Sequence, residues 1–241
     1  MVSIEVENLQ LTYPLRNRPS LALRDRRIPE MTGRLRGQGR HRYVIALDGI
    51  TFSLNAGDRL GLVGSNGSGK TTLLKVLYGI YPPTSGTVKV SGRVDALFNI
   101  NLGFRREATG RRNIELRGLI NGWTPKQISE RMDEIVEFSE LGEFIDLPFK
   151  SYSQGMAARL AFSVATALDP EILLMDEWIG AGDRKFQEKA RARMTELAAK
   201  AGIIVLASHN HGLIKRTCSK VLELDNGRVT AFYDKIEDFK E

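Results

Sequence analysis

Apolar and polar residues alternate in the first part of the chain, and the alternation predicts strands. Residues 3–13, SIEVENLQLTY, predict a strand with one buried face. Residues 44–64 predict two more strands on either side of a turn at 55–57. The spacing becomes helical at 69–80, GKTTLLKVLYGI, and alternation returns at 85–97. The first hundred residues therefore predict sheet structure with one helix.

Helical spacing dominates from residue 104 to residue 168. Thr124 can cap a helix, and Pro125 suits the first position of that helix. Its apolar face consists of Ile128, Met132, Ile135 and Val136. A second helix is predicted at 155–168, where it stops before Asp169-Pro170.

The last third of the chain combines short apolar runs with helices. Residues 171–176, EILLMD, have the continuous apolar character of a buried strand. A polar helix at 183–200 and a strand at 202–207 follow. Residues 220–233 predict a hairpin that turns at Asn226-Gly227.

The order of these elements predicts an α/β fold in one domain, 1–241. Strands at both ends form a core at about 1–97 and 166–241, with a mixed, mainly parallel sheet. The helical middle is an inserted subdomain at about 98–165. A segment at about 14–43, rich in arginine, proline and glycine, interrupts the strand pattern after the first predicted strand.

Charge is distributed unevenly along the chain. The net charge is +6, whereas residues 16–42 alone hold nine arginines and two acids, or +7. A localised basic stretch suits an anionic partner such as nucleic acid or a membrane. No apolar run reaches the length of about 18–20 residues that spans a bilayer, and the N-terminal residues show no secretion signal. The single cysteine, Cys218, is expected to be a buried small apolar residue.

Residues 64–71, GSNGSGKT, match the pattern G-x-x-x-x-G-K-[ST] at every fixed position, between a predicted strand and a predicted helix. Gly64, Gly67 and Gly69 let the backbone curl so that N–H groups point at phosphate oxygens. Lys70 is placed to reach the β- and γ-phosphates of a nucleotide, and Thr71 to bind Mg²⁺. The remaining residues expected to surround the nucleotide phosphates are Ser65, Asn66, Ser68 and Thr72.

Two acids end the buried strand at 172–177, ILLMDE. A parallel strand delivers Asp176 to the carboxyl edge of the sheet, where ligands collect. Asp176 is expected to hold Mg²⁺ through water. Glu177 is expected to orient or deprotonate an attacking water molecule.

A serine and a histidine add two further candidates. Ser153 can cap the helix that follows it, and Gly155 allows a ligand close to the backbone, which suggests a second anion-binding helix start. The alternative is ordinary helix capping. His209 follows a strand and could contact the γ-phosphate or hold Glu177 and water in line; the alternative is an exposed loop histidine.

In this order the motifs resemble those of ATP-binding cassette (ABC) transporter ATPases over essentially the whole chain. GSNGSGKT resembles the Walker A motif and ILLMDE the Walker B motif with its catalytic glutamate. YSQGM at 152–156 resembles the cassette signature, GAGD at 180–183 the D-loop, and SHN at 208–210 the H-loop. The variant signature and residues 100–114, INLGFRREATGRRNI, are similar to the subfamily that exports lipid-linked polysaccharides such as O-antigens, galactans and teichoic acids.

The resemblance implies a P-loop NTPase (RecA-like) core with ATP and Mg²⁺ as cofactors, and catalytic roles for Lys70, Glu177 and His209. Two copies of the chain would pair head to tail, so that Ser153, Gln154 and Gly155 of one face the nucleotide of the other. The expected partners are this second copy and an integral membrane permease, and the expected location is the cytoplasmic face of the cell membrane.

One position departs from the family pattern, and the role of a second position has two interpretations. ABC ATPases usually have a glutamine that touches Mg²⁺ at the start of the helical subdomain, and this chain has Asn99 and Asn101 near that place. Asn99 is the expected metal contact, and Asn101 is the alternative. Tyr13 is a candidate for stacking on adenine, and the alternative is a strand aromatic in the core.

The basic stretch at 16–42 occupies the place of an insertion that the subfamily carries. Apolar residues recur among its arginines at roughly helical spacing, which is typical of membrane-surface elements. It is expected to bind the anionic membrane or the lipid-linked glycan, and the alternative is a solvated loop. Nucleic acid is not expected, because there is no recognition helix or aromatic platform. The alternative functions are an ABC ATPase for another substrate and a soluble ABC ATPase that is not part of a transporter.

Overall fold

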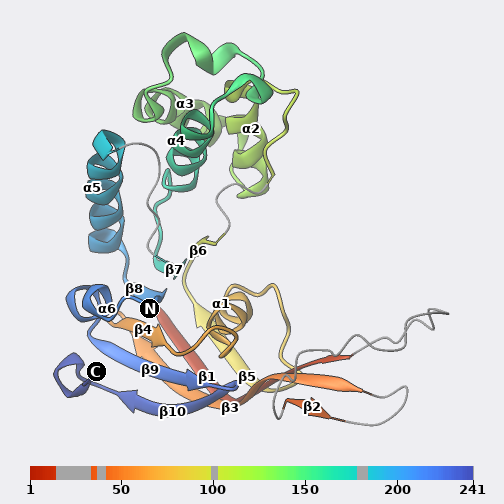
Figure 1. Ribbon diagram of the computed structural model, residues 1–241, viewed down its shortest axis with the longest axis vertical. Coiled ribbons are helices and arrows are strands. Elements are labelled where there is room, and N and C mark those ends of the chain that lie inside the picture. Colours follow the sequence, from red (N-terminus) through yellow and green to blue (C-terminus); the bar gives the residue numbers. More distant parts are fainter. Residues whose placement is uncertain (15–33, 37–41, 99–102, 178–183, 241) are drawn as a thin grey trace. The chain divides into compact units, whose positions relative to one another are not determined.

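A computed structural model describes residues 1–14, 34–36, 42–98, 103–177 and 184–240 of the chain (Figure 1). The chain forms two compact units. The first, here the core unit, consists of Met1–Ala96, Glu171–Glu177 and Gly202–Glu241. The second, here the helical unit, consists of Leu97–Pro170 and Trp178–Ala201. Asn99 and the segment at 180–183 lie outside the described residues.

A four-stranded antiparallel sheet forms one part of the core unit, in the order β2-β3-β1-β5. Its strands are β1 (Ser3–Pro14), β2 (Leu35–Arg36), β3 (Tyr43–Asn55) and β5 (Ser85–Ser91). Alternation along β1 buries Ile4 and Val6 and then Leu9 and Leu11. The buried positions change from even to odd residue numbers between Val6 and Leu9. The pairing of β1 with β3 shifts in register at the same place, where Asn8 has a φ of 47°.

A six-stranded mixed sheet forms the second part, in the order β10-β9-β4-β8-β7-β6. Its strands are β4 (Arg59–Val63), β6 (Val94–Leu97), β7 (Ile172–Asp176), β8 (Ile203–Ala207), β9 (Lys220–Asp225) and β10 (Arg228–Tyr233). β4 pairs in parallel with β8 and β9, β7 pairs in parallel with β8, and β9 and β10 form the predicted antiparallel hairpin. The mixed sheet predicted from the sequence is confirmed. The separate antiparallel sheet was not expected, and β3 and β4, although consecutive, belong to different sheets.

Two α-helices and a short 3₁₀ helix belong to the core unit within the described part of the chain. They are α1 (Lys70–Leu77), α6 (His211–Thr217) and η3 (Ile236–Asp238). The sequence predicts α1 from its spacing, and α1 buries Leu73, Leu74, Val76 and Leu77. Cys218 follows α6 and is buried as predicted, and burial raises the pKa of its thiol to about 12.

The described residues of the helical unit include a buried apolar cluster. Its elements are α2 (Gly110–Ile120), α3 (Pro125–Ser139), η1 (Gly142–Asp146), η2 (Phe149–Ser151), α4 (Gln154–Ala165) and α5 (Arg184–Lys200). The buried cluster consists of Ile114, Ile135, Leu141, Ile145, Leu160, Val164 and Ala167. No helix in the described ranges combines the length and the apolar content needed to cross a bilayer.

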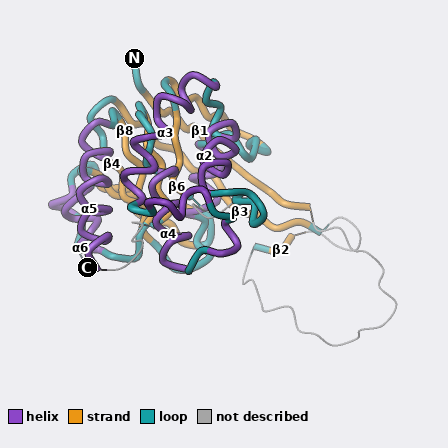
Figure 2. Tube along the Cα trace, turned by 90° about the horizontal axis from the view of Figure 1, so that it is seen from above, coloured by secondary structure: helices purple, strands orange, loops and turns teal. Residues whose placement is uncertain are grey.

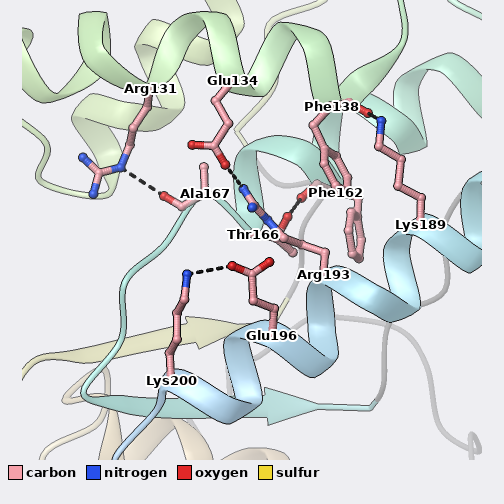
Figure 3. Close-up of polar contacts among 10 residues, drawn as sticks. All are labelled: Arg131, Glu134, Phe138, Phe162, Thr166, Ala167, Lys189, Arg193, Glu196 and Lys200. Carbon is pink, nitrogen blue, oxygen red and sulfur yellow. Dashed lines mark hydrogen bonds and ion pairs between the residues drawn. The ribbon is translucent and has the colours of Figure 1, made fainter.

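The sequence predicted that residues 183–200 belong to the core. In the structure residues 184–200 of this segment form α5, which belongs to the helical unit and contacts α3 (Figure 3). Arg193 forms an ion pair with Glu134 of α3, and the Lys189 ammonium donates to the Phe138 carbonyl at 3.0 Å. The Phe186 ring lies edge-on to Phe138, with centroids 5.7 Å apart. The sequence did not indicate these contacts for two reasons. The composition of α5 is mostly polar, and each contact joins α5 to a residue that is distant in the sequence.

The start of α3 is formed as the sequence predicts. The Thr124 hydroxyl accepts a hydrogen bond from the Gln127 N–H at 3.3 Å. The Gln127 side chain accepts one from the Thr124 N–H at 2.9 Å, which completes a capping box with Pro125 at the first position. These bonds satisfy N–H groups that would otherwise lack partners at the helix end.

Replacement of Thr124 by alanine should therefore lower the free energy of unfolding by about 1 kcal/mol. Urea denaturation followed by circular dichroism measures this change. Lys126→Ala alters an exposed side chain in the same turn of the helix, and we expect a change below about 0.5 kcal/mol. Equal losses in the two variants would contradict the capping box.

Candidate functional site

The loop between β4 and α1 has the backbone conformation that its glycines predict. Gly64, Gly67 and Gly69 have φ values of 141°, 80° and 118°, which side-chain-bearing residues rarely adopt. Gly69 is the N-cap of α1, and no side chain caps this helix. The first N–H groups of α1 are therefore left without a side-chain partner at the positive end of the helix, which is an arrangement suited to an anion. Ser65 and Asn66 are exposed in this loop, and Ser68 is buried.

The far side of this loop packs closely on backbone from two other strands. A Cβ atom at Gly64 would lie 2.1 Å from the Leu224 carbonyl oxygen in β9. At Gly227, in the turn between β9 and β10, it would lie 2.5 Å from the Ala46 carbonyl oxygen in β3. The glycines thus allow the loop and the turn to approach their neighbours more closely than any other residue would permit.

Lys70 lies across the loop that precedes it. Its ammonium donates hydrogen bonds to the carbonyls of Gly64 at 2.7 Å and Ser65 at 3.0 Å. Burial lowers the pKa of Lys70, and the negative charges of Glu177 and Asp176 act in the opposite direction. Two carbonyls thus hold the ammonium at the loop. An incoming anion can replace these carbonyls as its hydrogen-bond acceptor.

Thr71 and Asp176 meet although they are far apart in the sequence. The Thr71 hydroxyl donates to the Asp176 carboxylate at 2.7 Å. The preceding residues of β7 are fully buried, and the strand ends with Asp176 at the edge of the sheet. Hydroxyl and carboxylate oxygens are the ligands that Mg²⁺ prefers. In the described ranges no three His, Cys, Asp or Glu side chains gather as a metal site, so a cation here would need phosphate or water oxygens as well.

Glu177 has a strained backbone and a fixed carboxylate. Its φ is 73°, which is uncommon outside glycine and costs about 1–3 kcal/mol. Its N–H donates to the Ala207 carbonyl at 2.9 Å. Its carboxylate accepts hydrogen bonds from the Ser208 hydroxyl at 3.0 Å and the His209 N–H at 3.2 Å, and the His209 Nε2 atom lies 3.9 Å away. Strain of this kind is typical of functional positions.

Ser208 was not a candidate in the sequence. It is 1% exposed, and it is the side-chain donor that fixes the Glu177 carboxylate. Its position directly before His209, at the end of β8, is the only local sign of this role. The contact itself joins neighbouring parallel strands, which no local pattern reveals.

Tyr13 lies beside the first turn of α1, where it hydrogen-bonds Thr72. Its ring is edge-on to Tyr81, with the centroids 5.6 Å apart. Burial raises the pKa of Tyr13, with a further contribution from Tyr81, whereas a hydrogen bond with Thr72 lowers it. The ring is half-buried. The predicted stacking on adenine stays a prediction.

A second exposed helix start lies in the helical unit. Ser153 is the N-cap of α4, and its hydroxyl accepts from the Met156 N–H at 3.2 Å. Ser153, Gln154 and Gly155 are all exposed. Apart from its chain neighbours and the backbone of its own helix, the nearest described atom to a Cβ atom at Gly155 would be the Ser153 hydroxyl oxygen at 3.9 Å. Packing within one copy therefore does not require a glycine at this position.

Comparison with known proteins gives one family. Residues 47–180 match the family model described as ABC transporter. The O-antigen export system ATP-binding protein RfbE of Yersinia enterocolitica is 42% identical over 95% of this chain and 97% of that protein. RfbB of Myxococcus xanthus, of the same description, is 45% identical over 81% of this chain, which spans 45% of that protein. The teichoic acids export ATP-binding protein TagH of Shouchella clausii is 40% identical over 83% of this chain and 56% of that protein.

Solved structures have the same fold. The dimeric post-hydrolysis state of the ATP-binding cassette MJ0796, bound to ADP and Pi, matches with a TM-score of 0.69 at 20% identity and covers 98% of this chain and 100% of that one. A structure of the ATP binding subunit of an ABC transporter matches with a TM-score of 0.67 at 21% identity, over 95% of this chain and 88% of that one.

The close packing of the loop predicts an order of stability for two variants. Gly64→Ala introduces both an unfavourable φ and a clash with the Leu224 carbonyl, so we expect a loss of about 3 kcal/mol or more. Gly67→Ala meets no atom within 4 Å, and only its φ is unfavourable, so the loss should be about 1–2 kcal/mol. Chemical denaturation measures both, and a larger loss for Gly67→Ala would contradict the described packing.

Proposed function

The chain belongs to the ABC transporter family, and from that premise we propose that it hydrolyses ATP to drive export of a lipid-linked polysaccharide, of O-antigen or galactan type, across the cytoplasmic membrane. The observation that supports ATP hydrolysis is that the side chains of Lys70, Thr71, Asp176 and Glu177 lie close together at one loop. The substrate class is supported by the similarity to RfbE, which extends over 97% of that protein.

The loop and α1 bind the phosphates of ATP. The N–H groups at the start of α1 lack a side-chain cap and donate to phosphate oxygens. Lys70 exchanges the carbonyls of Gly64 and Ser65 for the β- and γ-phosphates. The Thr71 hydroxyl and the Asp176 carboxylate are the residues that would hold Mg²⁺, which when bound supplies positive charge to the phosphate oxygens.

Glu177 activates the attacking water. The water oxygen forms a bond to the γ-phosphorus, the bond from that phosphorus to the β–γ bridging oxygen breaks, and ADP leaves. Glu177 accepts the proton of the water, as general-base chemistry requires. The Ser208 hydroxyl and the His209 N–H hold the carboxylate in place for this transfer. The His209 imidazole is exposed near the same carboxylate and contacts the γ-phosphate or the water.

A second copy of the chain completes the site. The exposed start of α4 offers a serine hydroxyl, backbone N–H groups and Gly155, a glycine that packing within its own copy does not require. These groups suit the γ-phosphate of ATP held by another copy, with the two copies paired head to tail. The permease is the membrane partner, and the dimer acts on the cytoplasmic face of the membrane through it.

Replacement of Glu177 by glutamine should lower ATP hydrolysis by a factor of about 10²–10⁴, because the general base is lost. Size-exclusion chromatography with saturating ATP should then show a dimer. Glu237→Gln changes an exposed carboxylate elsewhere in the core unit and should leave both properties as in the wild type. Undiminished hydrolysis by Glu177→Gln would contradict the assigned role.

The arginine-rich stretch at 16–42 is proposed to bind an anionic membrane surface or the pyrophosphate head group of the lipid-linked substrate. Its net charge of +7 exceeds that of the entire chain, and each cation near anionic lipid contributes about 1 kcal/mol. This stretch would bring the ATPase to the lipid from which the substrate is drawn.

A variant with serine at Arg16, Arg18, Arg24 and Arg26 tests this role. Binding to vesicles that contain anionic lipid should weaken by at least about tenfold, and export should fall, because four charges are removed. Hydrolysis by the isolated protein should not change. A charge-matched variant with serine at Arg112, Lys126, Lys185 and Lys200 serves as the control. Unchanged export and vesicle binding in the first variant would contradict the proposal.

A further inference from the structure

One arginine of the basic stretch is buried against the far side of the phosphate-binding loop. Arg34 is only 8% exposed. Its Nη1 donates to the Gly67 carbonyl at 2.7 Å, and its Nη2 donates to the Ser68 carbonyl at 2.9 Å. The charge pattern of the sequence did not distinguish Arg34 from the other arginines of this stretch, whereas the structure shows that its guanidinium contacts the chain itself.

The carbonyl of Arg34 and the two residues that follow it are paired with β3. The Arg34 carbonyl accepts from the Ile45 N–H at 3.0 Å. The next two residues form β2, in which Leu35 pairs with Val44 and Arg36 with Tyr43 (Figure 2). The guanidinium therefore belongs to the residue directly before a paired strand.

The two carbonyls that Arg34 binds determine the direction of two peptide groups. In a trans peptide the C=O and the following N–H point in opposite directions. A donor held on the Ser68 carbonyl thus fixes the Gly69 N–H, at the start of α1, away from Arg34. The Ser68 carbonyl also accepts from the Gly227 N–H at 2.8 Å, so two donors act on this peptide. A cationic donor polarises the peptide and strengthens its N–H as a donor.

The partners of the guanidinium favour this role over a purely structural one. Burial of a charge is costly unless it is paired, and buried arginines usually bind carboxylates. Among the described residues the oxygens that Arg34 bonds are the carbonyls of Gly67 and Ser68, and its Nε has no partner. Burial lowers the pKa of Arg34, whereas the charge of Asp225 raises it. The desolvated cation is thus directed at the loop.

We propose that Arg34 is a positioning residue for nucleotide binding, which orients the peptides of Gly67 to Gly69 so that the loop is formed before the phosphates arrive. The inference rests on the proposed function, since it assumes that this loop binds ATP.

Isothermal titration with MgADP, which is not hydrolysed, tests the proposal. Arg34→Leu removes two charge-assisted hydrogen bonds and should weaken binding by about tenfold or more. Arg34→Lys keeps the charge but loses the bidentate geometry of the guanidinium, so it should weaken binding by about threefold. Arg36→Leu, at an exposed position in β2, is the control and should bind as the wild type does. In ATPase assays Arg34→Leu should raise KM and leave kcat within about twofold, because the catalytic groups are intact.

Wild-type affinity in a folded Arg34→Leu protein would overturn the proposal, even if its free energy of unfolding were lower, because the role would then be structural only. If Arg34→Leu does not fold, Arg34→Lys decides: weaker MgADP binding supports the proposal and unchanged binding overturns it. Failure of the wild type to bind MgADP would instead overturn the proposed function of the loop.

Discussion

The direction of the peptide groups in the loop before α1 is the constraint on which the rest of the site depends. Backbone N–H groups bind phosphate only if the carbonyls of the same peptides are held on the opposite side. Here the β9–β10 turn and Arg34 hold them, and glycine at positions 64 and 227 makes the necessary approach possible. Lys70 and Thr71 follow directly in the chain, so their placement depends on this loop.

Most of the site could be predicted from the sequence because its chemistry lies in short contiguous runs. The loop, Lys70 and Thr71 belong to one motif, and Asp176 and Glu177 end one apolar strand. Ser208 and Arg34 could not be identified in this way, because their contacts reach residues more than 30 positions away. The antiparallel sheet escaped prediction for a related reason: alternation identifies strands but not their partners, and consecutive strands here enter different sheets.

Two features of the chain suit a site shared between two copies better than a site within one copy. Glu177 is held in an unfavourable backbone conformation with its carboxylate fixed by Ser208 and His209, an arrangement that stability alone does not favour. Ser153 and Gly155 form an exposed helix start that nothing in their own copy occupies among the described residues. Both are explained if a triphosphate is enclosed between two copies, with the hydrolytic groups on one and the closing groups on the other.

The dependence of the hydrolysis rate on protein concentration tests this claim most directly. If each site needs groups from two copies, the rate per mole of the purified wild-type chain should fall steadily on dilution, in proportion to the fraction of dimer measured by sedimentation with ATP. A rate per mole that stays constant down to concentrations at which the protein is monomeric would contradict the account, because a single copy would then hydrolyse ATP without its partner.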